Sequence, residues 1–125
     1  MTSAPQKRIL IIEDEKPMAK ALELKLTHLG FFAESASNGE IGLALLEKEN
    51  FDLVLLDIVM PKVDGFGVLE AMKQKKIKTP VIMLSNLSQE EDEKKAKALG
   101  ALYFFIKSNT PLTDIVAHVQ LILQK

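Results

Sequence analysis

The sequence contains no cysteine, which excludes disulfide bonds and thiolate metal sites and fits a reducing compartment. It also has no apolar run long enough to span a membrane. Near the amino terminus, the apolar run from Ile9 to Ile12 is followed at once by acidic residues, so we expect no signal peptide. These absences favour a cytoplasmic protein with no membrane partner.

The chain also lacks an excess of either charge. Sixteen basic residues stand against seventeen acidic ones, which gives a formal net charge of −1. We therefore expect no direct nucleic-acid binding, and any partner must be recognised by a local surface. A chain of 125 residues that is 47% hydrophobic is long enough for one core. It predicts a single domain over 1–125, with an ordered core from about residue 7 to about residue 124.

Five short segments are predicted to be strands. Four of them are almost wholly apolar, which is typical of strands buried on both faces of a parallel sheet. The remaining one is more polar and is therefore expected at an edge of the sheet. In chain order the five are 8–12, the more polar 31–36, 51–56, 80–84 and 102–106.

Segments of helical length separate these strands. Apolar residues at spacings of three and four predict a first helix that begins at Pro17 and ends at Gly30. The same periodicity predicts a last helix, entered through Thr110 and Pro111. Strand and helix thus alternate five times along the chain. This alternation predicts an α/β fold in which helices cover both faces of a parallel sheet.

Two further helix starts are expected from the spacing of polar residues. Ser37 with Glu40, and Ser88 with Glu91, are placed as capping boxes. The helix after Ser88 is rich in charge and offers few apolar side chains to a core. We expect it to be loosely docked: a solvated helix is the simpler interpretation, and a movable output surface is the functional one.

Polar residues lie where the predicted strands end. Glu13 and Asp14 follow the first strand, Asp57 the third, Ser85 the fourth and Lys107 the fifth. Each alone has an ordinary explanation, such as a turn, a backbone hydrogen bond or a solvated charge. Because ligands of open parallel sheets bind outside the carboxyl ends of the strands, their coincidence at one edge favours a functional site.

The chemistry of this set favours magnesium and phosphate. Three neighbouring carboxylates repel one another until a proton or a cation intervenes. With oxygen donors alone, the natural cation is a hard one such as Mg²⁺. Lys107 adds a point charge suited to a phosphoryl oxygen. A carboxylate beside a metal and an ammonium can accept a phosphoryl group, and Asp57 is the best candidate for this role.

Four stretches of the sequence resemble the receiver domain of two-component response regulators, the CheY-like family. They are "ILIIEDE", "DLVLLDIVMPKVDGF", "PVIMLS" and "GALYFFIK", in the order and spacing of that family. The resemblance covers essentially the whole chain. It implies a flavodoxin-like, doubly wound (βα)5 fold with a five-stranded parallel sheet of order 2-1-3-4-5.

The resemblance also implies roles for individual residues. Asp57 matches the aspartate that accepts a phosphoryl group from a phosphohistidine on a histidine kinase or a phosphotransfer protein. Glu13, Asp14, Asp57 and the backbone carbonyl of Val59 match the ligands of Mg²⁺. Lys107 matches the lysine that pairs with the phosphoryl group.

A second set of roles concerns the switch. Ser85 matches the hydroxyl that moves toward the phosphoryl group, and Phe104 matches the switch aromatic. The resemblance implies that the fourth helix, fifth strand and fifth helix then present a changed face to a downstream protein or an attached output domain. It also allows a phosphorylation-dependent homodimer. Gly65 is expected to give backbone freedom to the loop after the third strand.

This chain departs from the family pattern at several positions. Ser108 follows Lys107 where the family usually has proline, often after a cis bond that would cost about 3 kcal/mol before serine. Asn86 follows the switch hydroxyl in place of alanine or glycine. Val59 and Leu87 are apolar at the two variable positions, where neither can position an attacking water. We therefore expect slow hydrolysis of the phosphoryl group.

The resemblance implies a signalling protein that catalyses only its own phosphorylation and dephosphorylation, rather than an enzyme with an external substrate. A haloacid dehalogenase-type phosphatase fits less well, because its nucleophile and second aspartate belong after the first strand. A flavodoxin-like binding module would need a phosphate loop where "EDEKPMA" stands. A degenerate receiver that acts only as a protein-interaction module is the remaining alternative, which the complete residue set disfavours.

Overall fold

The computed structural model describes residues 6–86 and 90–124. Five parallel strands form one sheet in the order β2-β1-β3-β4-β5, as the resemblance implied. β2 lies at one edge, which agrees with its more polar sequence. The strands are β1 (Arg8–Ile12), β2 (Phe32–Ala36), β3 (Leu53–Asp57), β4 (Val81–Ser85) and β5 (Tyr103–Ile106).

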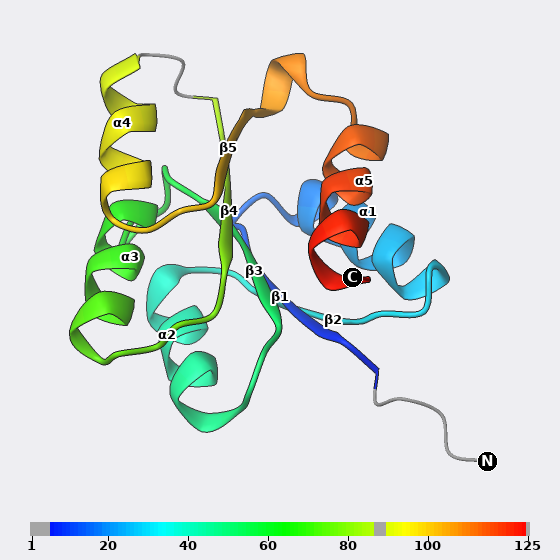
Figure 1. Cartoon of the computed structure of the whole chain (residues 1–125), viewed down its shortest axis with the longest axis horizontal. Helices are drawn as coiled ribbons and strands as arrows, with labels where there is room; N and C mark the ends of the chain where they lie inside the picture. Colours follow the sequence, from blue (N-terminus) through cyan, green and yellow to red (C-terminus); the bar gives the residue numbers. More distant parts are fainter. Residues whose placement is uncertain (1–5, 87–89, 125) are drawn as a thin grey trace.

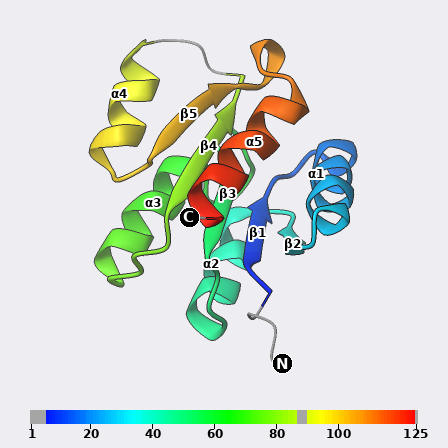
Figure 2. The same ribbon diagram turned by 45° about the vertical axis from the view of Figure 1, so that its right-hand side comes forward.

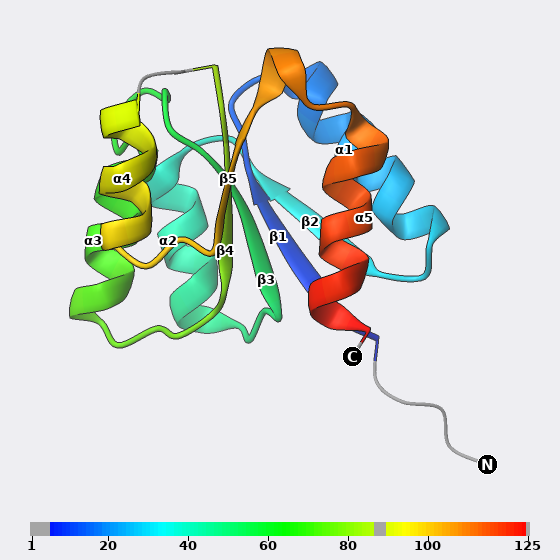
Figure 3. The same ribbon diagram turned by 45° about the horizontal axis from the view of Figure 1, so that its top comes forward.

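The helices cover both faces of this sheet (Figure 1). α1 and α5 lie together on one face, and α2, α3 and α4 lie on the other, an arrangement that is clear when the molecule is turned (Figures 2 and 3). None of the helices in the described part of the chain is long and apolar enough to cross a membrane. The helices are α1 (Lys16–His28), α2 (Gly39–Lys48), α3 (Gly65–Gln74), α4 (Glu90–Ala98) and α5 (Leu112–Leu123).

Successive side chains of each strand point to opposite faces of the sheet, and they form one hydrophobic core on each face. In β3, Leu53 and Leu55 pack with α1 and α5, while Val54 and Leu56 pack with α2 and α3. All of β3 and β4 is buried, because parallel strands between two helical layers have no solvent face. The central strand is therefore held rigidly up to its last residue, Asp57.

The expected helix ends are partly confirmed. Pro17 lies in the first turn of α1, and Gly30 follows α1 with φ +96°. The capping box at Ser37 is wrong: Asn38 is the N-cap of α2, and its Oδ1 accepts a hydrogen bond from the Ile41 amide at 2.9 Å. Both side chains are good caps, and the backbone becomes helical one residue later than the spacing suggested. The prediction at Ser88 lies outside the described residues.

α4 is the most polar helix, and Ala96 is its one buried residue. Lys94 pairs with Glu90 at 3.6 Å and Lys97 with Glu93 at 2.9 Å along its exposed side. Such exposed pairs contribute at most about 0.5 kcal/mol each. α4 is thus attached to the sheet by little apolar surface, which suits a helix that can be displaced.

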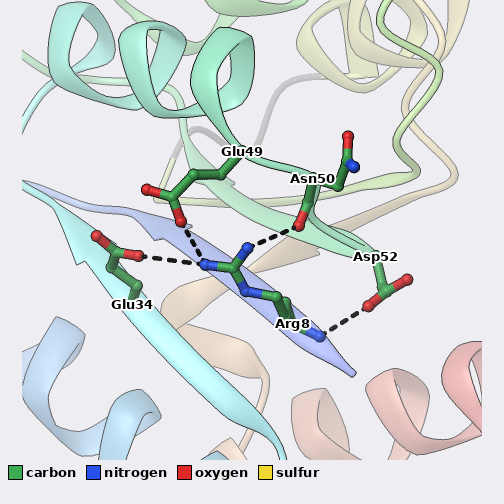
Figure 4. Close-up of polar contacts among 5 residues, drawn as sticks. All are labelled: Arg8, Glu34, Glu49, Asn50 and Asp52. Carbon is green, nitrogen blue, oxygen red and sulfur yellow. Dashed lines mark hydrogen bonds and ion pairs between the residues drawn. The ribbon is translucent and has the colours of Figure 1, made fainter. Parts of the chain in front are cut away.

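A polar cluster closes the amino-terminal end of the sheet around Arg8 (Figure 4). Its guanidinium pairs with Glu49, donates to the Asn50 carbonyl at 3.2 Å and lies 4.0 Å from Glu34. It also contacts two aromatic rings, 4.8 Å from the centre of Phe32 and 4.9 Å from that of Phe51. This end of the sheet joins β1, β2 and the start of β3, and it is opposite the end that carries Asp57.

Candidate functional site

Asp57 lies at the carboxyl end of β3, between β1 and β4, and is 5% exposed. The loop that follows returns close to it: the Gly65 amide donates to the Ile58 carbonyl at 2.8 Å. A Cβ at Gly65 would lie 2.4 Å from the Asp57 carbonyl oxygen. Gly65 has no positive φ, so the expectation that it supplies backbone freedom is wrong. Its missing side chain is what lets the loop approach Asp57.

Two further acids meet Asp57 from the end of β1. Glu13 is buried and Asp14 is exposed. One carboxylate oxygen from each of the three residues lies within 4.8 Å of the others. Glu13 is held in place by the backbone: its amide donates to the Ala36 carbonyl at 3.0 Å, and its Oε2 accepts from the Glu15 amide at 3.1 Å. The structure thus brings together the three acids that the sequence singled out.

Lys107 faces this acidic cluster from the end of β5, at the start of the short 3₁₀ helix Lys107–Asn109. Its Nζ lies 2.6 Å from Glu13 Oε1, 2.9 Å from Glu15 Oε1 and 3.4 Å from Asp57 Oδ1. The lysine therefore pairs more closely with Glu13 than with Asp57. Glu15 was missed as a partner of Lys107, although it is the third acid of the "EDE" run.

The close packing of these charged side chains shifts the pKa values of Asp57 and Lys107. Burial raises the pKa of Asp57 to about 7, and the negative charge of Glu13 adds to the rise, while Lys107 opposes it. Burial by itself would lower the pKa of Lys107, but hydrogen bonds to Glu13 and Glu15 outweigh it and the pKa is raised. Near neutral pH the cluster thus holds a charged lysine beside an aspartate that is only partly ionised.

The donor set fits a hard divalent cation. Three carboxylates converge, two of them buried, and their mutual repulsion contributes to the raised pKa of Asp57. Mg²⁺ prefers such oxygen ligands and usually retains several waters. The exposed Asp14 leaves one side of the cluster open to solvent. Glu13, Asp14 and Asp57 could therefore hold Mg²⁺ together.

The residues of the expected switch lie on the neighbouring strands. Ser85 is the last residue of β4 and is fully buried, and in the sheet register it stands beside Ile106. Asn86, the next residue, is exposed. Phe104 is half-buried and packs against the core under α2, α3 and α4. Its neighbours in β5 point to the opposite face, where Tyr103 and Phe105 both contact the ring of His118 in α5.

Two of the departures from the family pattern can be located. Val59 is 61% exposed, so most of its side chain faces solvent. The described chain contains no cis peptide bond, and the bond from Lys107 to Ser108 is accordingly trans. Leu87, the other variable position, lies outside the described residues.

Comparison with known proteins identifies the family. Residues 9–120 match the family model of the response regulator receiver domain. The probable transcriptional regulator ycf27 of Cyanidium caldarium is 37% identical over 96% of this chain and 47% of its own length. The alkaline phosphatase synthesis transcriptional regulatory protein PhoP of Bacillus subtilis is 34% identical over 95% of this chain and 49% of its own. The chain spans about half the length of these relatives.

Solved structures agree with this assignment. A CheY-like receiver domain protein from Methanospirillum hungatei superimposes with a TM-score of 0.89 at 27% identity, covering 96% of this chain and 95% of that one. The response regulator TrrA from Thermotoga maritima, in complex with Mg²⁺-BeF, has a TM-score of 0.82 at 30% identity, covering 94% of this chain and 100% of its own. Together with the fold and the acidic site, these matches show that the chain belongs to the response regulator receiver domain family of two-component systems.

Proposed function

We propose that Asp57 accepts a phosphoryl group from a phosphohistidine on a histidine kinase or a phosphotransfer protein. The observation that carries the proposal is a buried carboxylate at the end of the central strand, with two acids and a lysine around it. In the transfer, an oxygen of Asp57 bonds to phosphorus. The bond from phosphorus to the histidine nitrogen breaks, and its electron pair stays on the imidazole. Catalysis would be limited to this transfer and to the later hydrolysis.

Glu13, Asp14 and Asp57 would hold Mg²⁺, and family resemblance adds the backbone carbonyl of Val59. When bound, Mg²⁺ supplies positive charge that keeps the carboxylates ionised and neutralises charge on the phosphoryl oxygens. The convergence of the three acids supports this assignment. So does the similar protein TrrA, whose structure is a complex with Mg²⁺-BeF.

Lys107 would change partner during the reaction. Its ammonium is shared among Glu13, Glu15 and Asp57, with Glu13 the closest. A phosphoryl group on Asp57 brings oxygens that carry more charge than the carboxylate they replace. These oxygens would therefore compete with the two glutamates for the ammonium. We infer that Lys107 moves toward Asp57 on phosphorylation and stabilises the transferred group.

The response is proposed to be a shift in population between two conformations. Ser85 and Phe104 would reorganise toward the phosphorylated Asp57, and the face formed by α4, β5 and α5 would change. The few apolar contacts of α4 support its displacement. Because the curated relatives are transcriptional regulators about twice as long, we propose a downstream protein or an attached output domain as the receiver of the signal. This domain would not itself contact nucleic acid.

The decisive experiment is the intact mass of the protein after incubation with acetyl phosphate and Mg²⁺. We expect one added phosphoryl group, which is lost in Asp57→Asn and in the presence of a chelator. An adduct that persists in Asp57→Asn would refute Asp57 as the acceptor. If no adduct forms and beryllofluoride also fails to bind, the domain acts only as a protein-interaction module and the proposal is wrong.

A further inference from the structure

A cavity lies at the end of the sheet opposite Asp57. It has a volume of about 390 Å³, within the usual range for small-molecule sites. Its walls come from the ends of α3 and α4 and from the starts of β4 and β5, and Figure 3 shows α3 and α4 on the same face of the sheet. The acidic cluster contributes no residue to it.

The lining of this cavity combines basic and apolar side chains. Lys73, Lys76 and Lys78, all exposed, line the cavity, and no carboxylate is among the described lining residues. Most of the other lining residues are apolar and include Met72 and Leu99. None of the ion pairs in the described part of the chain involves these three lysines. The cavity is therefore complementary to a molecule with an anionic edge and an apolar body.

Lys75, which lies between Lys73 and Lys76 in the sequence, does not face the cavity. Lys75 turns toward α2 and pairs with Glu47 at 3.4 Å, and it does not line the cavity. The basic run from Lys73 to Lys78 is thus divided by the fold into one paired lysine and three that face the cavity. A uniformly solvated charge run would show no such division.

The backbone at Lys76 adopts a conformation that is uncommon for a residue other than glycine. α3 ends in a Schellman turn, in which the Lys76 amide donates to the Lys73 carbonyl at 3.2 Å and the Ile77 amide to the Met72 carbonyl at 2.9 Å. This turn needs a left-handed residue. Gly30 after α1 and Gly100 after α4 meet the same need with φ +96° and +110°, whereas after α3 it is Lys76, with φ +59°. A side chain there is less favourable than glycine, and at this position it belongs to one of the three lysines that line the cavity.

We propose that this cavity binds a small organic anion with an apolar body. Its carboxylate or phosphate group lies against Lys73, Lys76 and Lys78, and its body lies against Met72 and Leu99. Nucleic acid fits less well, because the described residues that line the cavity include no aromatic ring to stack on a base. An anionic membrane fits less well because the apolar residues form a hollow rather than a protruding surface. This binding requires neither Asp57 nor Mg²⁺, so it is independent of the proposed phosphorylation.

Titration of ¹⁵N-labelled protein with sodium octanoate, followed by NMR, tests the proposal. Octan-1-ol, which lacks the charge, and inorganic phosphate, which lacks the apolar body, are the control probes. We expect octanoate to shift the amide resonances of the cavity residues and to bind about tenfold more tightly than either control probe, because several exposed ion pairs add modestly. Asp57→Asn should bind equally well. Equal binding of octan-1-ol, or shifts located elsewhere, would overturn the proposal.

Two lysine variants provide a matched comparison. Lys76→Gly should weaken octanoate binding severalfold without lowering the melting temperature, because glycine suits the left-handed turn. Lys75→Gln removes the same unit of charge from the same run and should leave binding unchanged. If the two variants weaken binding equally, the effect is one of net charge and the site assignment is wrong. A loss of binding in Lys76→Gly with an intact fold supports it.

Discussion

Replacing Asp57 by asparagine should make the metal-free domain more stable at alkaline pH, in a way that depends on pH. In the folded protein the pKa of Asp57 is about 7, against 3.8 for an ordinary aspartate. Between these values the folded state holds a proton that the unfolded chain has lost, so stability falls as pH rises and levels off above about 7. Asparagine cannot ionise, and Asp57→Asn should lack this decline.

The size of the effect follows from the same shift. The part of the pKa shift of Asp57 that lies above pH 5 is about two pKa units. The free energy of unfolding of the wild-type domain should therefore fall by about 3 kcal/mol between pH 5 and pH 8. Urea unfolding followed by circular dichroism at both pH values, with a chelator present, measures this fall in the free energy of unfolding. The stability difference between Asp57→Asn and the wild type should grow by about 3 kcal/mol from pH 5 to pH 8.

A metal titration provides the complementary measurement. Mg²⁺ binds the ionised cluster and so should stabilise the wild type more at pH 8 than at pH 5. In Asp57→Asn the dependence of this gain on pH should be reduced. A stability difference between the two proteins that is the same at both pH values would show that Asp57 ionises normally in the folded domain, and the electrostatic reasoning about the cluster would fail.

Three further outcomes are expected. Lys107→Met leaves Glu13 and Asp57 without their shared cation and should cost about 3 kcal/mol at pH 8, and less at pH 5, by urea unfolding; an unchanged stability would contradict the ion pairs. The phosphorylated domain should decay slowly, because the exposed Val59 cannot orient water, and a half-life of seconds by intact mass would refute this. Arg8→Lys should cost about 1–2 kcal/mol, because lysine cannot reproduce the planar contacts, yet leave phosphorylation of Asp57 unchanged; a loss of phosphorylation would contradict the separation of the two ends of the sheet.

The fold and most of the site could be predicted because both depend on patterns that are local in sequence. Apolar runs and helical spacing identify the strands and helices, and the carboxyl ends of parallel strands must share an edge. Glu13, Asp14, Asp57 and Lys107 could thus be grouped without a structure. The strand order and the roles of individual residues came from the family resemblance, because alternation of strand and helix leaves them open.

What could not be predicted depends on distances between segments that are remote in the chain. The Lys107 ammonium pairs with three acids because of where β5 lies relative to β1. No local sequence pattern predicts that position. The cap of α2 fell on Asn38 because two adjacent residues are both suitable and the backbone decides between them. Gly65 was expected to supply backbone freedom, and only packing shows that its missing side chain is what the loop needs. The left-handed Lys76 was unexpected because glycine usually fills that position.

The complete burial of β3 constrains how this chain can diverge. Successive side chains of a strand face opposite sides of the sheet, so the insertion or deletion of one residue within β3 would exchange its two faces and turn Asp57 away from Glu13 and Lys107. An insertion or deletion in the loops at either end of the strand would not exchange the faces of β3. Length variation among descendants of this sequence should therefore accumulate in its loops, while the interval from Leu53 to Asp57 stays at five residues.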